Sequence, residues 1–234
     1  MDMTTGFLPL MLGFAIMAVA SIAIYARGSK RPEIRHHTQF HSAVPFLAAT
    51  AYLAMALGVG KLEVEGETIY LARYLDWAVT TPILLTGLAM TGLHEHARHS
   101  SYILPVVALD VVMIGAGLLS AIADTAAERW IWYGWSCAAF CGVLYVLWIP
   151  VRRLSAQMGG AMDGVYVANL TFVTLVWLAY PIVFLAGPQG LGIVGEVTDI
   201  SAVLVLDVIS KVVYGLLATA RLDRIPTSEL RELA

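Results

Sequence analysis

The sequence predicts an all-α membrane protein, a single domain (1–234) in which seven transmembrane helices form a bundle. Hydrophobic residues make up 59% of the chain, charged residues make up 13%, and the mean hydropathy is +0.77, far outside the usual range of a soluble domain. A helix needs roughly 20 apolar residues to cross a bilayer. Seven such runs nearly exhaust the chain, at about 5–27, 37–58, 72–93, 101–121, 129–150, 164–186 and 196–222.

Charged residues between the runs predict the orientation. Basic residues follow the first, third, fifth and seventh runs: Arg27, Lys30, Arg31, Arg35, Arg98, Arg152, Arg153, Arg221 and Arg224. The opposite loops are mainly acidic, with Glu63, Glu65, Glu67, Asp124 and Glu128 against the cations Lys61 and Arg129. By the positive-inside rule, the N-terminus lies outside and the C-terminus lies in the cytoplasm. The tail past Arg221 is short and polar, and we expect it to be frayed.

The second run opens with His36, His37 and His41, and the last two share a helix face on the cytoplasmic side. Because histidine titrates near neutral pH, this pair is either a proton relay or two polar side chains that reach into the headgroups. The next loop has a short alternating pattern around Glu65 and Gly66. This pattern predicts a short extracellular β-hairpin between the second and third helices.

The third run contains the segment RYLDWAVTTP, in which three polar residues lie one turn apart. Asp76 and Thr80 share a helix face, and Arg73 lies one turn outward of Asp76. Gly87 follows eleven residues after Asp76, in a cytoplasmic half that has no carboxylate.

The fifth and sixth runs are rich in aromatic residues. The fifth contains a cluster that fits either an interface belt or a ligand wall: Trp130, Trp132, Tyr133 and Trp135. In the sixth run, Trp177, Tyr180 and Phe184 fall on one face of WLAYPIVF. They either pack a core or line a box for a long apolar chromophore.

The seventh run carries two charges within an apolar stretch, Asp207 and Lys211. A charge at mid-membrane costs about 2.5–3.5 kcal/mol, so it marks a functional candidate. A structural ion pair is one interpretation. The other is that Lys211, held in an apolar pocket, reacts with an aldehyde to form a Schiff base with Asp207 as its counterion. If Asp76 and Arg73 face this pair, the four formal charges balance, as buried charges require.

The segments RYLDWAVTTP, WLAYPIVF and LDVISK together resemble the microbial (type 1) rhodopsins, over roughly residues 5–222. The resemblance implies all-trans retinal bound as a Schiff base on Lys211. It implies that Asp76 is the primary proton acceptor, Asp207 a second counterion and Arg73 a gating cation. Asp199 matches one acid of a proton-release pair found in some relatives, and Gln189 stands in place of the other.

The same resemblance implies the residues around retinal. Tyr52 and Tyr180 would hydrogen-bond Asp207, and Leu84 stands at a position tied to colour tuning. The polyene and its ring would be lined by Trp77, Thr81, Met113, Trp132, Ser136, Trp177, Tyr180 and Phe184.

The triplet Asp76, Thr80 and Gly87 resembles the Asp-Thr-Gly subgroup of proteobacterial rhodopsins. This implies a light-driven outward proton pump without a carboxylate donor. The proton would return from the cytoplasmic side through His41 and His37 or through water. A sensory rhodopsin that signals to a transducer is the alternative.

We expect a multi-pass protein of the bacterial inner membrane. Its expected partners are the lipid bilayer, protons and further copies of itself in a trimer or pentamer, with no nucleic acid. No metal site is expected, and a conventional enzyme is disfavoured because the sequence has no nucleophile–base pair, metal cluster or phosphate loop.

Overall fold

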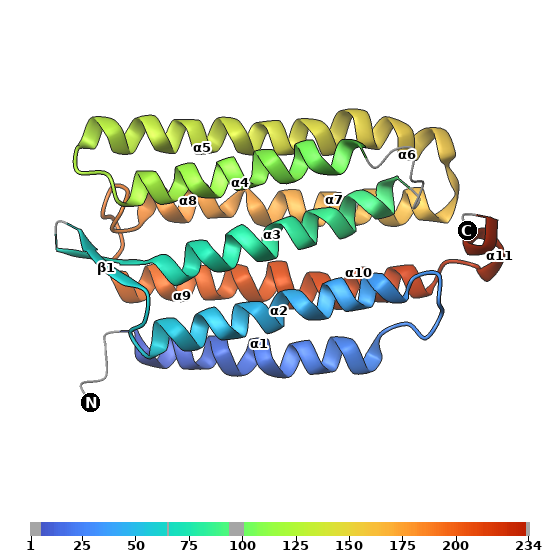
Figure 1. The fold of residues 1–234 in the computed structure, drawn as a ribbon, viewed down its shortest axis with the longest axis horizontal. Helices are drawn as coiled ribbons and strands as arrows, with labels where there is room; N and C mark the ends of the chain where they lie inside the picture. The colour runs from blue at the N-terminus through green and yellow to red at the C-terminus, as the bar shows by residue number, and fades with distance from the viewer. Residues whose placement is uncertain (1–5, 65, 94–100, 233–234) are drawn as a thin grey trace.

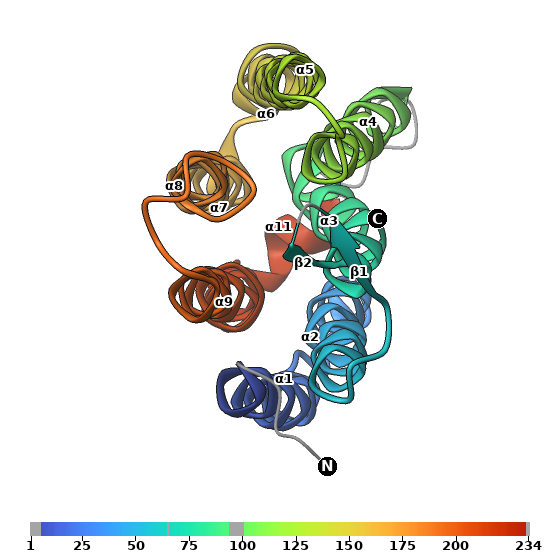
Figure 2. The same ribbon diagram turned by 90° about the vertical axis from the view of Figure 1, so that its left-hand side faces the viewer.

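The computed structural model describes residues 6–64, 66–93 and 101–232, and it confirms the predicted seven-helix bundle with a small β-hairpin. Thr5, Glu65 and Arg98, which entered the predictions above, lie outside the described residues. The first four helices are α1 (Phe7–Arg27), α2 (Arg35–Ala56), α3 (Leu71–Gly92) and α4 (Ile103–Ala121). Consecutive helices among these four pack side by side. Figure 2 views the bundle from one end and shows its helices arranged around a common centre.

The remaining three crossings are each built from more than one helical segment. The fifth joins α5 (Ala126–Val146), the π-helical turn η2 (Leu147–Val151) and α6 (Arg152–Met158). The sixth joins α7 (Gly160–Trp177) and α8 (Ala179–Ala186). The seventh joins α9 (Glu196–Asp207), the π-helical turn η3 (Val208–Val213) and α10 (Tyr214–Asp223), and it packs against α1, α2 and α7.

Within the described residues, five of these crossings are long and apolar enough to span a membrane by length and composition alone. The two others, α2 and α3, are each 22 residues long but more polar. Their polarity comes from side chains singled out in the sequence, among them His37 and His41 in α2 and Arg73 and Asp76 in α3. The two crossings that are least apolar over their whole length therefore carry many of the candidate functional residues.

The β-hairpin consists of β1 (Lys61–Val64) and β2 (Glu67–Tyr70), paired antiparallel with Lys61 opposite Tyr70. Gly66 in its turn has a φ of 86°, in the left-handed region that glycine adopts without strain. The hairpin and the N-terminal end of α1 lie at one end of the bundle, here called the hairpin end (Figure 1). The C-terminal segment lies at the opposite end, here called the tail end.

Two helix boundaries differ from the predictions for local reasons. The fifth helix begins at Ala126 because the Thr125 hydroxyl caps it, accepting a hydrogen bond from the Glu128 N–H at 3.2 Å. The sixth is interrupted between α7 and α8 at Leu178, three residues before Pro181. Proline has no N–H to donate into the preceding turn, which accounts for this break.

The prediction of a frayed tail is wrong. The segment α11 (Thr227–Glu232) folds back on the tail end, where Leu230 is 2% exposed and packs with Met162 and Ile34. The Arg31 guanidinium donates to the Leu222 carbonyl at 2.9 Å and to the Ile225 carbonyl at 2.7 Å. These hydrogen bonds satisfy carbonyls at and just after the end of α10. The tail is polar overall, but its few apolar side chains pack against the bundle and hold it in place.

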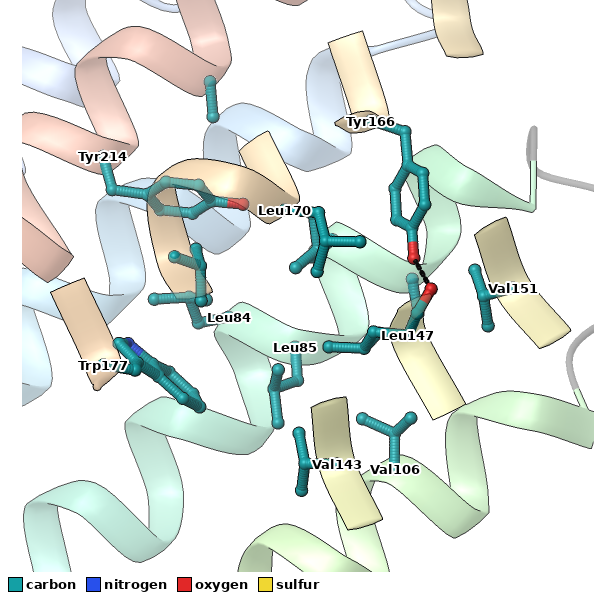
Figure 3. Packing of buried hydrophobic residues seen from close by; sticks show 14 of the residues in the cluster. Leu84, Leu85, Val106, Val143, Leu147, Val151, Tyr166, Leu170, Trp177 and Tyr214 are labelled. Carbon is teal, nitrogen blue, oxygen red and sulfur yellow. Dashed lines mark hydrogen bonds between the residues drawn. The ribbon is translucent and has the colours of Figure 1, made fainter. Parts of the chain in front are cut away.

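The largest buried apolar cluster lies where α3, α4, η2, α7 and α10 meet (Figure 3). Leu85, Val106 and Leu170 are each at most 1% exposed in it. Leu84 and Trp177 belong to the same cluster and also line the cavity described below. The core therefore fixes one wall of the candidate site.

Candidate functional site

Lys211 lies at the centre of the bundle, between two carboxylates. Its Nζ atom contacts Asp76 Oδ2 from α3 and lies 3.2 Å from Asp207 Oδ2, one turn earlier in its own helix. The three residues are at most 7% exposed. Since buried charges are tolerated only when they are paired, these contacts explain how the apolar bundle holds a lysine and two aspartates.

The two carboxylates differ in their hydrogen bonds. Asp207 accepts from the Tyr52 hydroxyl at 3.0 Å, the Tyr180 hydroxyl at 2.7 Å and the Trp77 indole at 3.3 Å. The Oδ1 atom of Asp76 has no hydrogen-bond partner in the part of the chain that the structure describes. Asp207 is therefore held by three donors, whereas one oxygen of Asp76 is left without a donor.

Thr80 supports Asp76 through the backbone. Its hydroxyl donates to the Asp76 carbonyl at 2.8 Å, and its side chain is fully buried. One turn toward the hairpin end, Arg73 forms a buried ion pair with Asp199, at 3.1 Å. The predicted group of four charges therefore has a fifth member, Asp199, which is the direct partner of Arg73.

A second carboxylate lies outward of Arg73. The Tyr70 hydroxyl donates to Glu196 Oε1 at 3.0 Å, and the Arg73 guanidinium lies 5.7 Å from the centre of the Tyr70 ring. Burial raises the pKa of Tyr70, and its hydrogen bond to Glu196 raises it further, so Tyr70 remains a neutral donor. Sequence reasoning did not pair Glu196 with Tyr70, because the two are 126 residues apart.

An apolar cavity extends from Lys211 between α3, α4, α5, α7 and α8. Of the residues predicted to line a chromophore, it contacts Trp77, Thr81, Leu84, Met113, Ser136, Trp177, Tyr180 and Phe184. Tyr52 does not line it but bonds Asp207. A lysine at one end and aromatic walls along the length are the features that a linear polyene aldehyde requires, so the residues present fit retinal.

Trp132 departs from its predicted place. Its side chain is 36% exposed and does not line the cavity, whereas the neighbouring Tyr133 does, stacking on Phe184 with ring centres 5.5 Å apart. One residue along a helix rotates a side chain by about 100°, since a turn holds 3.6 residues. Because this helix has aromatic residues on all sides, its composition could not show whether Trp132 or Tyr133 faces the cavity. Cys137 and Phe140, which also line the cavity, were missed as well.

The predicted histidines lie on the tail-end side of Lys211. His37 is 1% exposed and His41 is 3% exposed, so both are buried inside the bundle. A Cβ atom added at Gly87 would lie 4.0 Å from His41 Cε1 and 3.8 Å from the Phe40 ring. The fold thus brings His41 next to Gly87, the position at which the predicted pump lacks a carboxylate donor.

The chain is similar to proteins of one family. The family described as bacteriorhodopsin-like protein matches residues 3–224. Archaerhodopsin-2 of Halobacterium sp. (strain aus-2) is 34% identical over 211 residues, covering 87% of this chain and 80% of the relative.

Two solved structures share the fold. The thermophilic rhodopsin of Rubrobacter xylanophilus has a TM-score of 0.88 and 31% identity over 98% of this chain and 99% of that chain. The light-driven proton pump rhodopsin of Coccomyxa subellipsoidea has a TM-score of 0.84 and 32% identity over 92% of this chain and 96% of that chain.

Proposed function

The chain belongs to the bacteriorhodopsin-like family, and we propose that it is a light-driven outward proton pump. It is a multi-pass membrane protein and not an enzyme, and it carries all-trans retinal as a Schiff base on the buried Lys211. The observation that carries the proposal is the contact between Lys211 Nζ and Asp76, with Arg73 and Asp199 beyond it toward the hairpin end. The Coccomyxa subellipsoidea relative, described as a light-driven proton pump, supports it.

The bound retinal would supply light absorption and isomerisation, which change the surroundings of the Lys211 nitrogen. Asp76 then accepts the proton from that nitrogen, because its Oδ2 atom is already in contact with Nζ. Asp207 stays beside the nitrogen, held by three hydrogen bonds. The proton that Asp76 has taken then passes outward past the Arg73–Asp199 pair to the hairpin end, and Asp76 is ionised again for the next cycle.

The Lys211 nitrogen must regain its proton from the other side. We propose that His41, with His37 one turn further toward the tail end, supplies it in place of a carboxylate at Gly87. Both histidines are buried, and His41 lies close to Gly87. These observations support a proton relay over the alternative that the two side chains reach into the lipid headgroups.

Replacing His41 with alanine is expected to slow the return of the proton to the Lys211 nitrogen at least about tenfold, since a positioned proton donor contributes a hundredfold or more in other proteins. Flash-induced absorbance changes measure this rate. A Gly87→Asp change in the same variant should restore part of it, because a Cβ atom at Gly87 meets only ordinary contacts and the lost imidazole leaves room for a carboxyl group. An unchanged rate in His41→Ala between about pH 5 and 8, the range in which histidine titrates, would eliminate the relay.

In the proposed pump, the hairpin end faces outside and the tail end faces the cytoplasm. The proposed location is a bacterial inner membrane. We also propose, from the resemblance, a trimer or pentamer.

A sensory rhodopsin is the second candidate, because the lack of a carboxylate at Gly87 also fits a slow signalling cycle. Unbuffered cells that express the protein with added retinal distinguish the two. A pump acidifies the medium in the light, and a protonophore abolishes the change. Cells that form the coloured protein but leave the pH constant would support the sensor.

A further inference from the structure

Tyr214 carries a buried hydroxyl that the rest of the site does not explain. It is the first residue of α10, three residues after Lys211, and its side chain is 1% exposed. The hydroxyl oxygen has no hydrogen-bond partner within the described part of the chain. Because burying a hydroxyl without a partner costs free energy that phenylalanine would not cost, an unbonded hydroxyl at such a position calls for a reason.

The same cluster contains a tyrosine that is fully bonded. Tyr166 is also fully buried, and its hydroxyl donates to the Leu147 carbonyl at 2.6 Å (Figure 3). Figure 3 also shows the Tyr214 hydroxyl pointing into the cluster toward Leu170, away from its own helix. The two hydroxyls therefore differ in bonding while sharing one apolar environment.

Tyr214 lies between the histidines and the cavity. Its ring meets the His41 ring edge-on, with centres 5.4 Å apart, and stacks on Phe172 at 6.0 Å. In the cluster it packs with Val44 and Leu84, which line the cavity that holds Lys211. A proton that travels from His41 to the Lys211 nitrogen must cross this apolar layer.

We propose that Tyr214 is a positioning residue whose hydroxyl holds the water through which a proton passes from His41 to the Lys211 nitrogen. This inference rests on the proposed function. The Tyr214 hydroxyl hydrogen-bonds that water, and the proton moves through the water. Tyr214 keeps its own proton throughout, so it stays neutral. Buried waters bind polar groups that lack a protein partner, and the Tyr214 hydroxyl is one such group beside His41.

Tyr214→Phe removes only the hydroxyl and tests the proposal. The return of the proton to the Lys211 nitrogen, followed by flash absorbance, should slow about tenfold, the change that one typical net hydrogen bond produces. Tyr166→Phe is the matched control, since it removes a hydroxyl from the same cluster, and its rate should stay within about twofold of the parent. Adding Tyr214→Phe to His41→Ala should produce no further slowing, because both residues act on one path.

A second readout needs no retinal. The thermal midpoint of the retinal-free protein should not fall in Tyr214→Phe, because no protein bond is lost. It should fall in Tyr166→Phe, which loses the hydrogen bond to the Leu147 carbonyl. A parent-like rate in Tyr214→Phe overturns the inference, and so does equal slowing in Tyr166→Phe. Flash absorbance reports the proton on Lys211 in a pump or a sensor. If the unmutated protein fails to acidify its medium, the proposed pump is refuted, but the role of Tyr214 is still tested by the flash measurement.

Discussion

Asp76→Asn is expected to reduce light-driven proton transport at least about a hundredfold while the coloured protein still forms, because a positioned base of this kind contributes that much or more. Asparagine keeps the shape of the side chain but cannot accept the proton from the Lys211 nitrogen, which Asp76 contacts directly. Asp207 remains paired with Lys211, so retinal can still attach. The measurement is the initial rate of pH change in illuminated vesicles at equal pigment content.

Asp110→Asn is the matched control for that experiment. Asp110 is a fully buried aspartate that accepts a hydrogen bond from Thr81 at 2.6 Å, and it makes no contact with Lys211 among the described residues. Its amide variant should keep most of the transport. If Asp76→Asn pumps as well as Asp110→Asn does, another group accepts the proton.

Lys211→Ala is expected to abolish the visible absorption band, since no other described residue offers an amine inside the cavity. It should also destabilise the protein by about 3–5 kcal/mol, because Asp76 and Asp207 lose the cation that both contact and a buried charge is left unpaired. Absorbance after retinal addition and the thermal unfolding midpoint measure the two effects.

A double variant separates colour from stability. Asp207→Asn combined with Lys211→Ala removes one of the unpaired carboxylates, so the midpoint should recover in part while the protein stays colourless. A visible band in either variant would show that retinal binds elsewhere or without a covalent bond.

The sequence was sufficient to predict the bundle because its signals are local. Apolar runs of membrane length and the glycine-containing turn near Gly66 depend on neighbours in the chain. The grouping of Asp76, Asp207 and Lys211 was also predictable, since buried charges must find partners and few candidates exist.

What the sequence missed depends on contacts between distant segments. The choice between Trp132 and Tyr133 is a choice of helix rotation, which packing decides. The docking of α11 depends on Leu230 packing with Met162 and Ile34, which lie far away in the sequence. The unbonded hydroxyl of Tyr214 is visible only when every neighbour of the side chain is known.

The proposed pump releases one proton at the hairpin end and takes up another at the tail end in each cycle. The most direct test uses vesicles of one known orientation, with a pH-sensitive dye on each side, after a single flash. We expect acidification on the hairpin side after Asp76 has received its proton, followed by alkalinisation on the tail side as the Lys211 nitrogen regains one. Release and uptake on the same side, or no change on either, would contradict it.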